Sequence, residues 1–278
     1  MKVVLFCGGM GTRLGELTDN VPKPLVRIGS RPILWYVMKY YAHHGHKEFI
    51  LCLGYRAERI KEYFLNYNEY LSNDFIMKDG EKELVGEAND IREWDISFVD
   101  TGLSSNVGQR LKAVESYLAG DDMFLANYAD GLSSLNLSEV VDRFAKSDKV
   151  ACLMCSKPRQ TFHVVSLGGN GLVESLQGVS QSGLLINAGF FVFRRELFRY
   201  LRDGEDLVEG PFRRLMANQQ LMGVRCDDFW CMDTFKEHQQ LSDIVASGNA
   251  PWEVWKPRVQ GVPEEEALQK RADAGRYR

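Results

Sequence analysis

Residues 3–14 read VVLFCGGMGTRL, a short apolar run that passes directly into a glycine-rich loop. The run Val3–Cys7 has the brevity and the β-branched content of a buried strand. Three glycines and two side-chain donors follow it: Gly8, Gly9, Gly11, Thr12 and Arg13. Glycine lets main-chain N–H groups approach a ligand closely, and a ring of such donors binds anionic oxygens. The stretch therefore predicts a strand that ends in a phosphate-binding loop.

The loop matches neither of the two common phosphate-binding motifs. It lacks the Gly-Lys-Ser/Thr ending of a Walker A loop and the G-x-G-x-x-G spacing of a dinucleotide site. A Rossmann dehydrogenase is disfavoured for the same reason. For the loop taken alone, a tight turn without a ligand stays an alternative.

Five further short apolar runs follow along the chain: Phe49–Leu53, Ile96–Val99, Met123–Ala126, Val150–Met154 and Ala188–Phe193. Amphipathic stretches lie between the runs: Ile33–His44, Ala57–Tyr67, Gly108–Tyr117 and Leu137–Ala145. This alternation predicts an α/β fold, Rossmann-like, with a mixed, mainly parallel sheet flanked by helices. Ligands of such sheets bind at the carboxyl ends of the strands.

Residues 1–256 are expected to form a single domain. Residues 66–94 contain the polar run KDGEKE and are too long for a simple connection, so they predict an excursion, a hairpin or an oligomer contact. The tail at 257–278 is rich in charge and is expected to be a short solvated helix or a frayed end.

The composition is that of an ordinary globular protein, with 278 residues, 45% hydrophobic and 26% charged. A formal net charge of −4 gives no basic field that would attract a nucleic acid or an anionic membrane. The first apolar run stops at Gly8, too early for a signal peptide, and no apolar stretch approaches the ~20 residues of a membrane span. We expect a soluble, cytoplasmic protein.

The six cysteines lie singly in mostly apolar segments and are expected to be reduced. Cys152 and Cys155 form a CxxC pair, but no second Cys or His pair stands at zinc spacing. Buried structural thiols are therefore the preferred interpretation.

Lys23 stands between two prolines in the run Pro22-Lys23-Pro24-Leu25, ten residues beyond Arg13. The fixed φ of proline limits where the lysine can point. Such stiffness suits a cation that neutralises charge on an α-phosphate, where positioning and electrostatics do most of the catalysis. A rigid surface turn with a solvated lysine is the alternative.

Together, residues 8–38, GGMGTRLGELTDNVPKPLVRIGSRPILWYVM, resemble the signature of the sugar-1-phosphate nucleotidyltransferases, G-G-x-G-T-R-L followed by P-K-P-L. The segments NYADG, NAGFFVF, DDFWCMDT and APWEVW are most similar to the glucose-1-phosphate cytidylyltransferase branch. The resemblance covers most of the chain. It implies that the glycine loop with Thr12 and Arg13 grips the nucleotide phosphates and that Lys23 contacts the transferring phosphoryl group.

Asp130 follows the apolar run Met123–Ala126, so a carboxylate stands at a strand end where it can hold magnesium. The resemblance matches Asp130 to the aspartate of a G-D-G motif, with Ala129 in place of the first glycine, and makes Asp233 the second magnesium ligand. Two carboxylates with phosphate oxygens and water fit the octahedral coordination of magnesium. Without the resemblance, a turn residue at Asp130 and a helix cap at Asp233 stay the alternative interpretations.

Arg110 stands near a strand end at the start of an expected helix, within reach of a phosphate or a base. The resembling branch carries paired glycines before this arginine, and here the second of them is Gln109. An exposed arginine at a helix start is the alternative.

The acceptor half departs from the family pattern. Asn187 and Gly189 are retained, and Glu174 is a candidate for a sugar hydroxyl. However, Gly178 and Val179 stand where the family has a glutamate and a phosphate-binding lysine. Three explanations stay open: a substitute cation from Arg159 or His163, an acceptor whose phosphate is carried differently, or lost catalysis.

The resemblance implies transfer from a nucleoside triphosphate, CTP favoured, to a phosphorylated small molecule such as glucose 1-phosphate, with Mg²⁺ as cofactor. It also implies a homo-oligomer, because residues 66–94 resemble a region used for assembly in related enzymes. The alternatives are another triphosphate, a non-glucose phosphorylated or phosphonate acceptor, and a catalytically silent nucleotide-binding homologue.

Overall fold

The computed structural model describes residues 1–85, 91–159 and 161–256. Seven strands form its central sheet in the order β14-β10-β13-β8-β1-β4-β7. Their bounds are β1 (Lys2–Phe6), β4 (Glu48–Leu53), β7 (Asp95–Asp100), β8 (Met123–Asn127), β10 (Ala151–Ser156), β13 (Ile186–Arg194) and β14 (Leu221–Arg225). β13 runs antiparallel to both of its neighbours, and every other pair in the sheet is parallel. The predicted mixed, mainly parallel α/β fold is confirmed.

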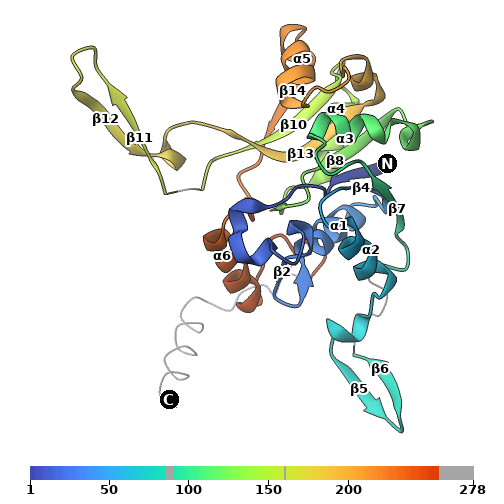
Figure 1. Cartoon of the computed structure of the whole chain (residues 1–278). Helices are drawn as coiled ribbons and strands as arrows, with labels where there is room; N and C mark the ends of the chain where they lie inside the picture. The colour runs from blue at the N-terminus through green and yellow to red at the C-terminus, as the bar shows by residue number, and fades with distance from the viewer. Residues whose placement is uncertain (86–90, 160, 257–278) are drawn as a thin grey trace, which may run out of the picture.

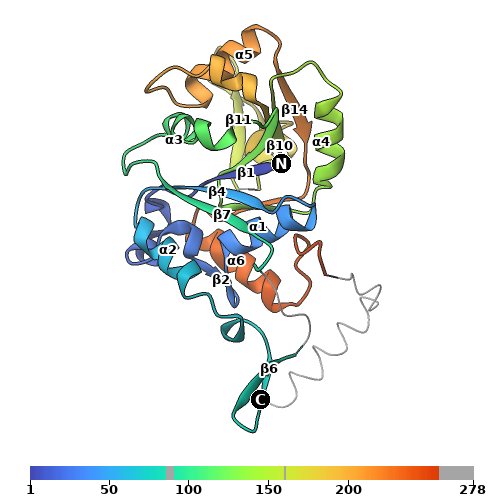
Figure 2. The ribbon, with the colours of Figure 1, turned by 90° about the vertical axis from the view of Figure 1, so that its right-hand side faces the viewer.

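Side chains of β1 alternate between two hydrophobic cores, one on each face of the sheet. Val3 and Leu5 point into the first core, and Val4 and Phe6 into the second. The first core lies under α1 (Ile33–His43), α2 (Ala57–Leu65), α4 (Leu137–Ala145) and α6 (Phe235–Ala246). The second lies under α3 (Val107–Ala113) and α5 (Arg213–Ala217) with the short turns η4 (Glu115–Leu118) and η6 (Arg195–Arg199). Figures 1 and 2 show the helices on both faces of the sheet.

All six predicted strands are present, each within two residues of its expected bounds. The expected helix Gly108–Tyr117 is divided instead, because α3 ends at Ala113 and a 3₁₀ turn follows. β14 was not predicted. It is a half-exposed edge strand with a glycine at its centre, so it lacks the apolar run of a buried strand.

Two further pairs of strands form outside the central sheet, and the first of them joins segments that are far apart in the sequence. β9 (Gly131–Ser133) pairs with β15 (Phe229–Cys231), so the segment after β8 lies beside the segment before α6. β2 (Arg27–Ile28) pairs with β3 (Arg31–Pro32) just before α1. The β9–β15 pairing places Asp130 and Asp233 next to each other.

Two hairpins project from the body (Figure 1). One is β5 (Phe75–Lys78) with β6 (Glu81–Leu84), preceded by η3 (Glu69–Leu71), and it occupies the expected excursion as far as the structure describes it. The other, which we call the arm, is β11 (His163–Leu167) with β12 (Val173–Gly178), followed by η5 (Val179–Gln181). The tail at 257–278 lies outside the described residues.

The cysteines are free thiols, and Cys152 and Cys155 both stand in the sheet strand β10. None of the helices in the described ranges combines the length and the apolar character needed to cross a membrane.

Candidate active site

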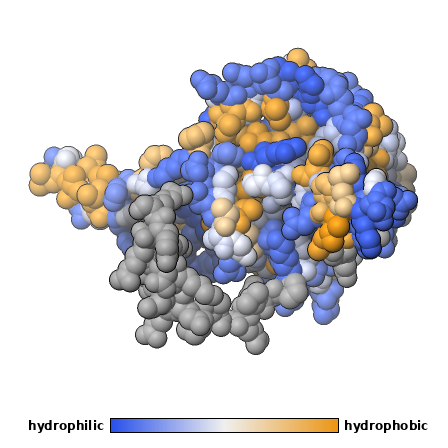
Figure 3. Space-filling model, turned by 90° about the horizontal axis from the view of Figure 1, so that it is seen from below, coloured by the Kyte–Doolittle hydropathy of each residue, from blue (hydrophilic) through white to orange (hydrophobic). Residues whose placement is uncertain are grey.

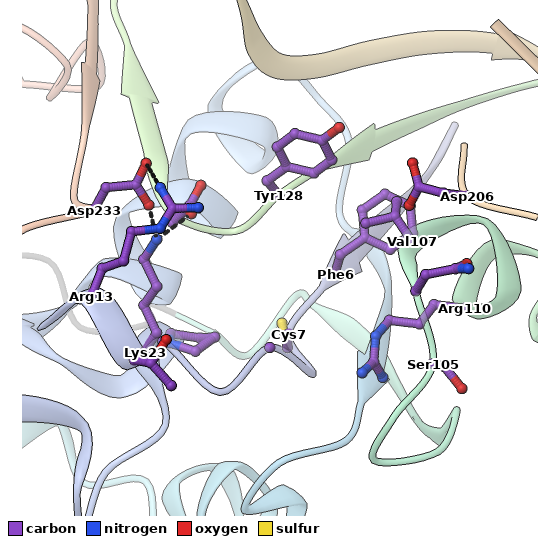
Figure 4. Close-up of a pocket in the computed structure, with 16 residues that line it drawn as sticks. Phe6, Cys7, Arg13, Lys23, Ser105, Val107, Arg110, Tyr128, Asp206 and Asp233 are labelled. Atoms are coloured by element: carbon purple, nitrogen blue, oxygen red, sulfur yellow. Dashed lines mark hydrogen bonds and ion pairs between the residues drawn. The ribbon is translucent and has the colours of Figure 1, made fainter. Parts of the chain in front are cut away.

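A cavity of about 420 Å³ opens at the carboxyl end of β1. Eight predicted site residues line it: Gly9, Gly11, Thr12, Arg13, Lys23, Arg110, Asp130 and Asp233. Figure 4 shows Arg13, Lys23 and Asp233 at one side of the cavity and Asp206, Val107 and Arg110 at the other. The cavity thus has a strongly charged side and a side that mixes apolar and polar groups.

The glycine loop runs from the end of β1 into the 3₁₀ turn Thr12–Thr18. Gly11 has φ of 65°, a left-handed conformation that favours glycine. A Cβ at this position would also lie 3.0 Å from the Cβ of Lys23. The Thr18 hydroxyl donates to the carbonyls of Gly11 and Gly15, which fixes the fold of the loop. Thr12 and Arg13 are exposed on this loop.

Lys23 is held between two carboxylates. Its Nζ donates to Asp130 Oδ2 at 2.5 Å and to Asp233 Oδ1 at 2.5 Å (Figure 4). Pro22 is extended and Lys23 begins a short 3₁₀ turn, so the backbone aims the side chain into the cavity, where it is only 14% exposed. The solvated surface lysine is therefore the wrong alternative. The predicted contact with a phosphoryl group stays a prediction.

Burial and neighbouring charge shift the pKa of Lys23, and that of Asp130, in opposite directions. Burial alone would lower the pKa of Lys23, but Asp130 and Asp233 together raise it above its ordinary value. Burial raises the pKa of Asp130, and the nearby Lys23 offsets this only in part. Lys23 therefore stays a cation over the whole physiological range.

Asp130 is aimed by a strained turn at the end of β8. Ala129 has φ of 62°, and its N–H donates to the side chain of Asn127 at 2.7 Å. Asn127 is itself 1% exposed and donates to the hydroxyl of Tyr41. A non-glycine residue in the left-handed region is strained, and such strain clusters at functional sites.

Asp233 stands two residues before the first residue of α6, Phe235. The helix cap is Thr234, which forms a capping box with Glu237, so the interpretation of Asp233 as the cap is wrong. The N–H of Met232 donates to the carbonyl of Asp130 at 3.0 Å, which ties the two acidic turns together. Arg13, 76% exposed, donates through Nη1 to Asp233 Oδ2 at 3.3 Å.

The donor set fits a hard divalent cation that takes its other ligands from phosphate and water. The carboxylates of Asp130 and Asp233 converge on one atom, and carboxylate oxygens are what Mg²⁺ prefers. Within the described parts of the chain, no group of three His, Cys, Asp or Glu side chains forms a complete protein site. The remaining ligands would be phosphate oxygens and water.

Arg110 is buried, so the interpretation as an exposed helix-start residue is wrong. Its Nη2 donates to the Gly8 carbonyl, while its Nη1 donates to the carbonyls of Leu53 and Gly102 and to the Thr101 hydroxyl. Burial lowers the pKa of the guanidinium. The side chain thus joins the ends of β1, β4 and β7, and its contact with a phosphate or base stays a prediction.

Gly8 owes its identity to this arginine. A Cβ on Gly8 would lie 2.1 Å from Arg110 Nη1, closer than any side chain allows. The glycine therefore serves packing against Arg110, and the structure does not place it among the residues that line the cavity.

Two of the predicted acceptor residues, Asn187 and Gly189, contact Tyr128, and Tyr128 lines the cavity. Asn187 donates to the Tyr128 hydroxyl at 3.3 Å and accepts from the N–H of Gly189 at 2.9 Å. Gly189 has φ of 72°, and a Cβ there would lie 2.6 Å from the Tyr128 ring. Burial raises the pKa of Tyr128 to about 12, so its hydroxyl keeps its proton.

Glu174 is not brought to this site. It stands on the exposed strand β12, and its carboxylate lies over Gly168 at the turn of the same hairpin. Glu174 therefore lies on the surface of a strand, because the hairpin leaves the body before Glu174 is reached (Figure 1).

Neither proposed substitute for the absent lysine reaches the cavity. Arg159 lies 4.5 Å over the Trp230 ring and donates to the Asp227 carbonyl, beside a second and smaller hollow. His163 pairs with Gly178 at the base of the arm and is exposed. A Cβ on Gly178 would meet only Ser180, at 3.9 Å, so there is room for a side chain that this sequence does not supply.

Several lining residues were not predicted: Phe6, Cys7, Pro24, Ser105, Asn106, Val107, Tyr128 and Asp206. Tyr128 stands inside the motif NYADG, two residues before Asp130, and this position in the sequence could have identified it as a residue of the site. Asp206 comes from a charged loop that resembles any solvated turn, and only the fold brings it to the cavity.

A family model and the curated relatives agree on one family. Residues 2–234 match the family model described as Nucleotidyl transferase. The glucose-1-phosphate cytidylyltransferase of Salmonella typhimurium is 37% identical over 259 residues, which cover 92% of this chain and 100% of that protein. The probable glucose-1-phosphate cytidylyltransferase of Bacillus subtilis is 35% identical over 260 residues, with the same coverage.

Solved structures share the fold at low identity. A UDP-glucose pyrophosphorylase complexed with UDP-glucose aligns with a TM-score of 0.65 and 14% identity, covering 89% of this chain and 99% of that one. A putative glucose-1-phosphate thymidylyltransferase from Bacillus anthracis aligns with a TM-score of 0.63 and 14% identity, covering 88% and 94%. With its family match and its curated relatives at 35 to 37% identity, this chain belongs to the nucleotidyl transferase family.

Proposed function

We propose that this protein joins CTP to a sugar 1-phosphate, giving a CDP-sugar and pyrophosphate. The observation that carries the proposal is the position of Lys23, held with Asp130 and Asp233 at the foot of the glycine loop. The choice of CTP and of a glucose 1-phosphate-like acceptor rests on the names of the relatives that are 35 to 37% identical.

A phosphate oxygen of the acceptor attacks the α-phosphorus of the triphosphate in line. One P–O bond forms there, the bond from the α-phosphorus to the β-phosphate oxygen breaks, and pyrophosphate leaves with the bonding electrons. The acceptor brings its own nucleophile, so the protein needs no Ser, Cys or His for covalent catalysis. Its contribution is positioning and electrostatics, as in other phosphoryl transfers.

The residues of the cavity divide this work. Loop N–H groups from Gly9 to Arg13 bind the triphosphate oxygens, and the Lys23 ammonium donates to an α-phosphate oxygen as charge builds there. Asp130 and Asp233 would hold Mg²⁺, which neutralises phosphate charge when bound. Asn187 and Tyr128 orient the acceptor across the cavity.

The acceptor side favours a second candidate within the same chemistry. Val179 supplies no cation, and Arg159 and His163 lie outside the cavity. A phosphate dianion without its own cation is bound less tightly. The second candidate is therefore the same transfer to a phosphorylated or phosphonate acceptor whose anionic group lies elsewhere in the cavity than that of glucose 1-phosphate.

Pyrophosphate release with Mg²⁺, crossing CTP, UTP, dTTP and ATP against a panel of sugar phosphates and phosphonates, tests the proposal. Turnover of CTP with glucose 1-phosphate supports the first candidate. Turnover of CTP with another acceptor alone supports the second. Tight CTP binding without turnover on any acceptor contradicts both and identifies a silent homologue.

We also propose that the protein is a homo-oligomer, with residues 66–94 kept as a candidate contact and the arm added as a further one. Val165 lies opposite Leu176, and Leu167 opposite Val173, so four apolar side chains share one face. They are 50 to 64% exposed, and the apolar patch is visible on the projecting hairpin in Figure 3. An isolated two-stranded hairpin is marginally stable in water, so this face needs cover.

Light scattering of Leu167→Asp checks the assembly, with Ser166→Asp on the opposite face as the matched control. Dissociation of the first variant alone is expected, and a wild-type monomer contradicts the proposal. A cytoplasmic location, with no nucleic-acid or membrane partner, completes the proposed function.

A further inference from the structure

The two carboxylates that would hold Mg²⁺ are already engaged. Asp130 Oδ2 and Asp233 Oδ1 each lie 2.5 Å from the same ammonium, the Nζ of Lys23. Arg13 contacts the second oxygen of Asp233 at 3.3 Å. Two positive side chains therefore balance the two negative ones.

An ammonium and a divalent cation cannot share this position. They would compete for the same two oxygens, and two positive charges at contact distance repel strongly in a partly buried site. In the described part of the chain these two carboxylates do not belong to a group of three His, Cys, Asp or Glu side chains that could hold a metal ion, so the protein offers the cation no complete site to set against the lysine. With Lys23 in place, a cation alone gains little by entering.

We propose that Lys23 closes the cation site of the free protein and leaves it only when triphosphate oxygens bind, so that the metal enters together with the nucleotide and not before it. This inference rests on the proposed function in one respect, since a triphosphate is the ligand that draws Lys23 away. The same Lys23 ammonium that closes the cation site would then donate to an α-phosphate oxygen.

The backbone permits this exchange without moving. Pro22 and Pro24 fix the chain on both sides of Lys23, so the change is confined to the side-chain torsions. The Cβ of Lys23 packs against the glycine loop, since a Cβ on Gly11 would lie 3.0 Å from it. The Lys23 ammonium would therefore reach phosphates bound by that loop through rotation of its side-chain torsions alone.

Arg13 cannot replace Lys23 as the closing group. Its side chain is 76% exposed and contacts Asp233 alone. An exposed ion pair of this kind contributes little, because water screens it. Arg13→Gln is therefore a control that removes one neighbouring charge but leaves the ammonium between the carboxylates.

Mn²⁺ binding measured by electron paramagnetic resonance, with no nucleotide or acceptor present, tests the inference. Lys23→Gln is expected to bind Mn²⁺ at least about tenfold more tightly than wild type, because the competing charge is gone. Arg13→Gln is expected to stay close to wild type. In the double variant with Asp233→Asn, the affinity gained by Lys23→Gln should be lost.

A second measurement uses the wild-type protein and needs no variant. Adding CTP is expected to tighten Mn²⁺ binding beyond the affinity of CTP alone for the ion, measured without protein. Nucleotide-free wild type that binds Mn²⁺ as tightly as Lys23→Gln would overturn the inference, as would a gain that survives Asp233→Asn. The nucleotide-free comparison does not depend on which triphosphate is the substrate, so it separates this inference from the proposed function.

Discussion

The main-chain N–H of Asp233 donates a hydrogen bond of 2.9 Å to the carboxylate of Glu237. The same carboxylate accepts from the N–H and the hydroxyl of Thr234. One side chain thus fixes the turn that carries Asp233 and also caps α6. The position of Asp233, the proposed metal ligand, therefore depends on Glu237, which is not among the residues that line the cavity.

Glu237→Ala should weaken both functions of this turn. We expect a loss of about 1–2 kcal/mol in the free energy of unfolding, because a helix cap and its hydrogen bonds are removed. Urea unfolding measures that loss, and the Mg²⁺ concentration for half-maximal activity should rise. Glu237→Gln keeps an acceptor oxygen and should recover most of both; equal damage from the two variants would argue against this role.

Asp130→Asn should separate stability from function. Burial raises the pKa of Asp130 above its ordinary 3.8, so the folded protein holds this proton more tightly than the unfolded chain. The ionised carboxylate therefore costs stability, and the loss grows as the pH rises from 3.8 through the folded pKa. At neutral pH the variant should be at least as stable as wild type in urea unfolding, yet inactive. Clear destabilisation would contradict the direction of this pKa shift.

Ala129→Val tests the strained turn before Asp130. Ala129 has φ of 62° and is fully buried, and a β-branched residue is disfavoured in this conformation. We expect a loss of about 1–2 kcal/mol in thermal or urea unfolding. Ala129→Gly relieves the strain and should keep the activity, so a valine variant as stable as the glycine variant would refute the interpretation.

Arg110→Lys should lower the stability of the protein, because Arg110 joins the carboxyl ends of β1, β4 and β7. Lysine cannot reproduce the five hydrogen bonds that the guanidinium donates to Gly8, Leu53, Thr101, Gly102 and Leu103. We expect about 2–3 kcal/mol less stability, since buried carbonyls lose their partners. The KM for the triphosphate should rise, because the glycine loop is no longer anchored. Unchanged stability with a raised KM would assign Arg110 to ligand contact alone.

Much of the fold could be predicted from the sequence because buried strands leave a local signal. Runs such as Phe49–Leu53 are apolar on both faces, so their positions are visible without knowledge of their partners. The antiparallel direction of β13 left no such signal, because strand direction depends on the path of the connection. The half-exposed β14 was missed for want of an apolar run.

The charged side of the site could be predicted because its residues stand in motifs with a chemical reason for their spacing. Arg13, Lys23, Asp130 and Asp233 do lie together. The burial of Arg110 was not predictable, because the carbonyls that surround it come from three segments that are far apart in the sequence. Glu174 was misplaced for a related reason, since the sequence does not show that its strand leaves the body.

Phosphorus NMR of the wild-type protein with CTP, Mg²⁺ and the accepted sugar phosphate tests the central claim most directly. We predict that CDP-sugar and pyrophosphate appear in equal amounts and that Lys23→Met lowers kcat by about 10²–10³, while the surface variant Lys146→Met does not. Absence of both products with every acceptor, or full turnover by folded Lys23→Met, would contradict the account.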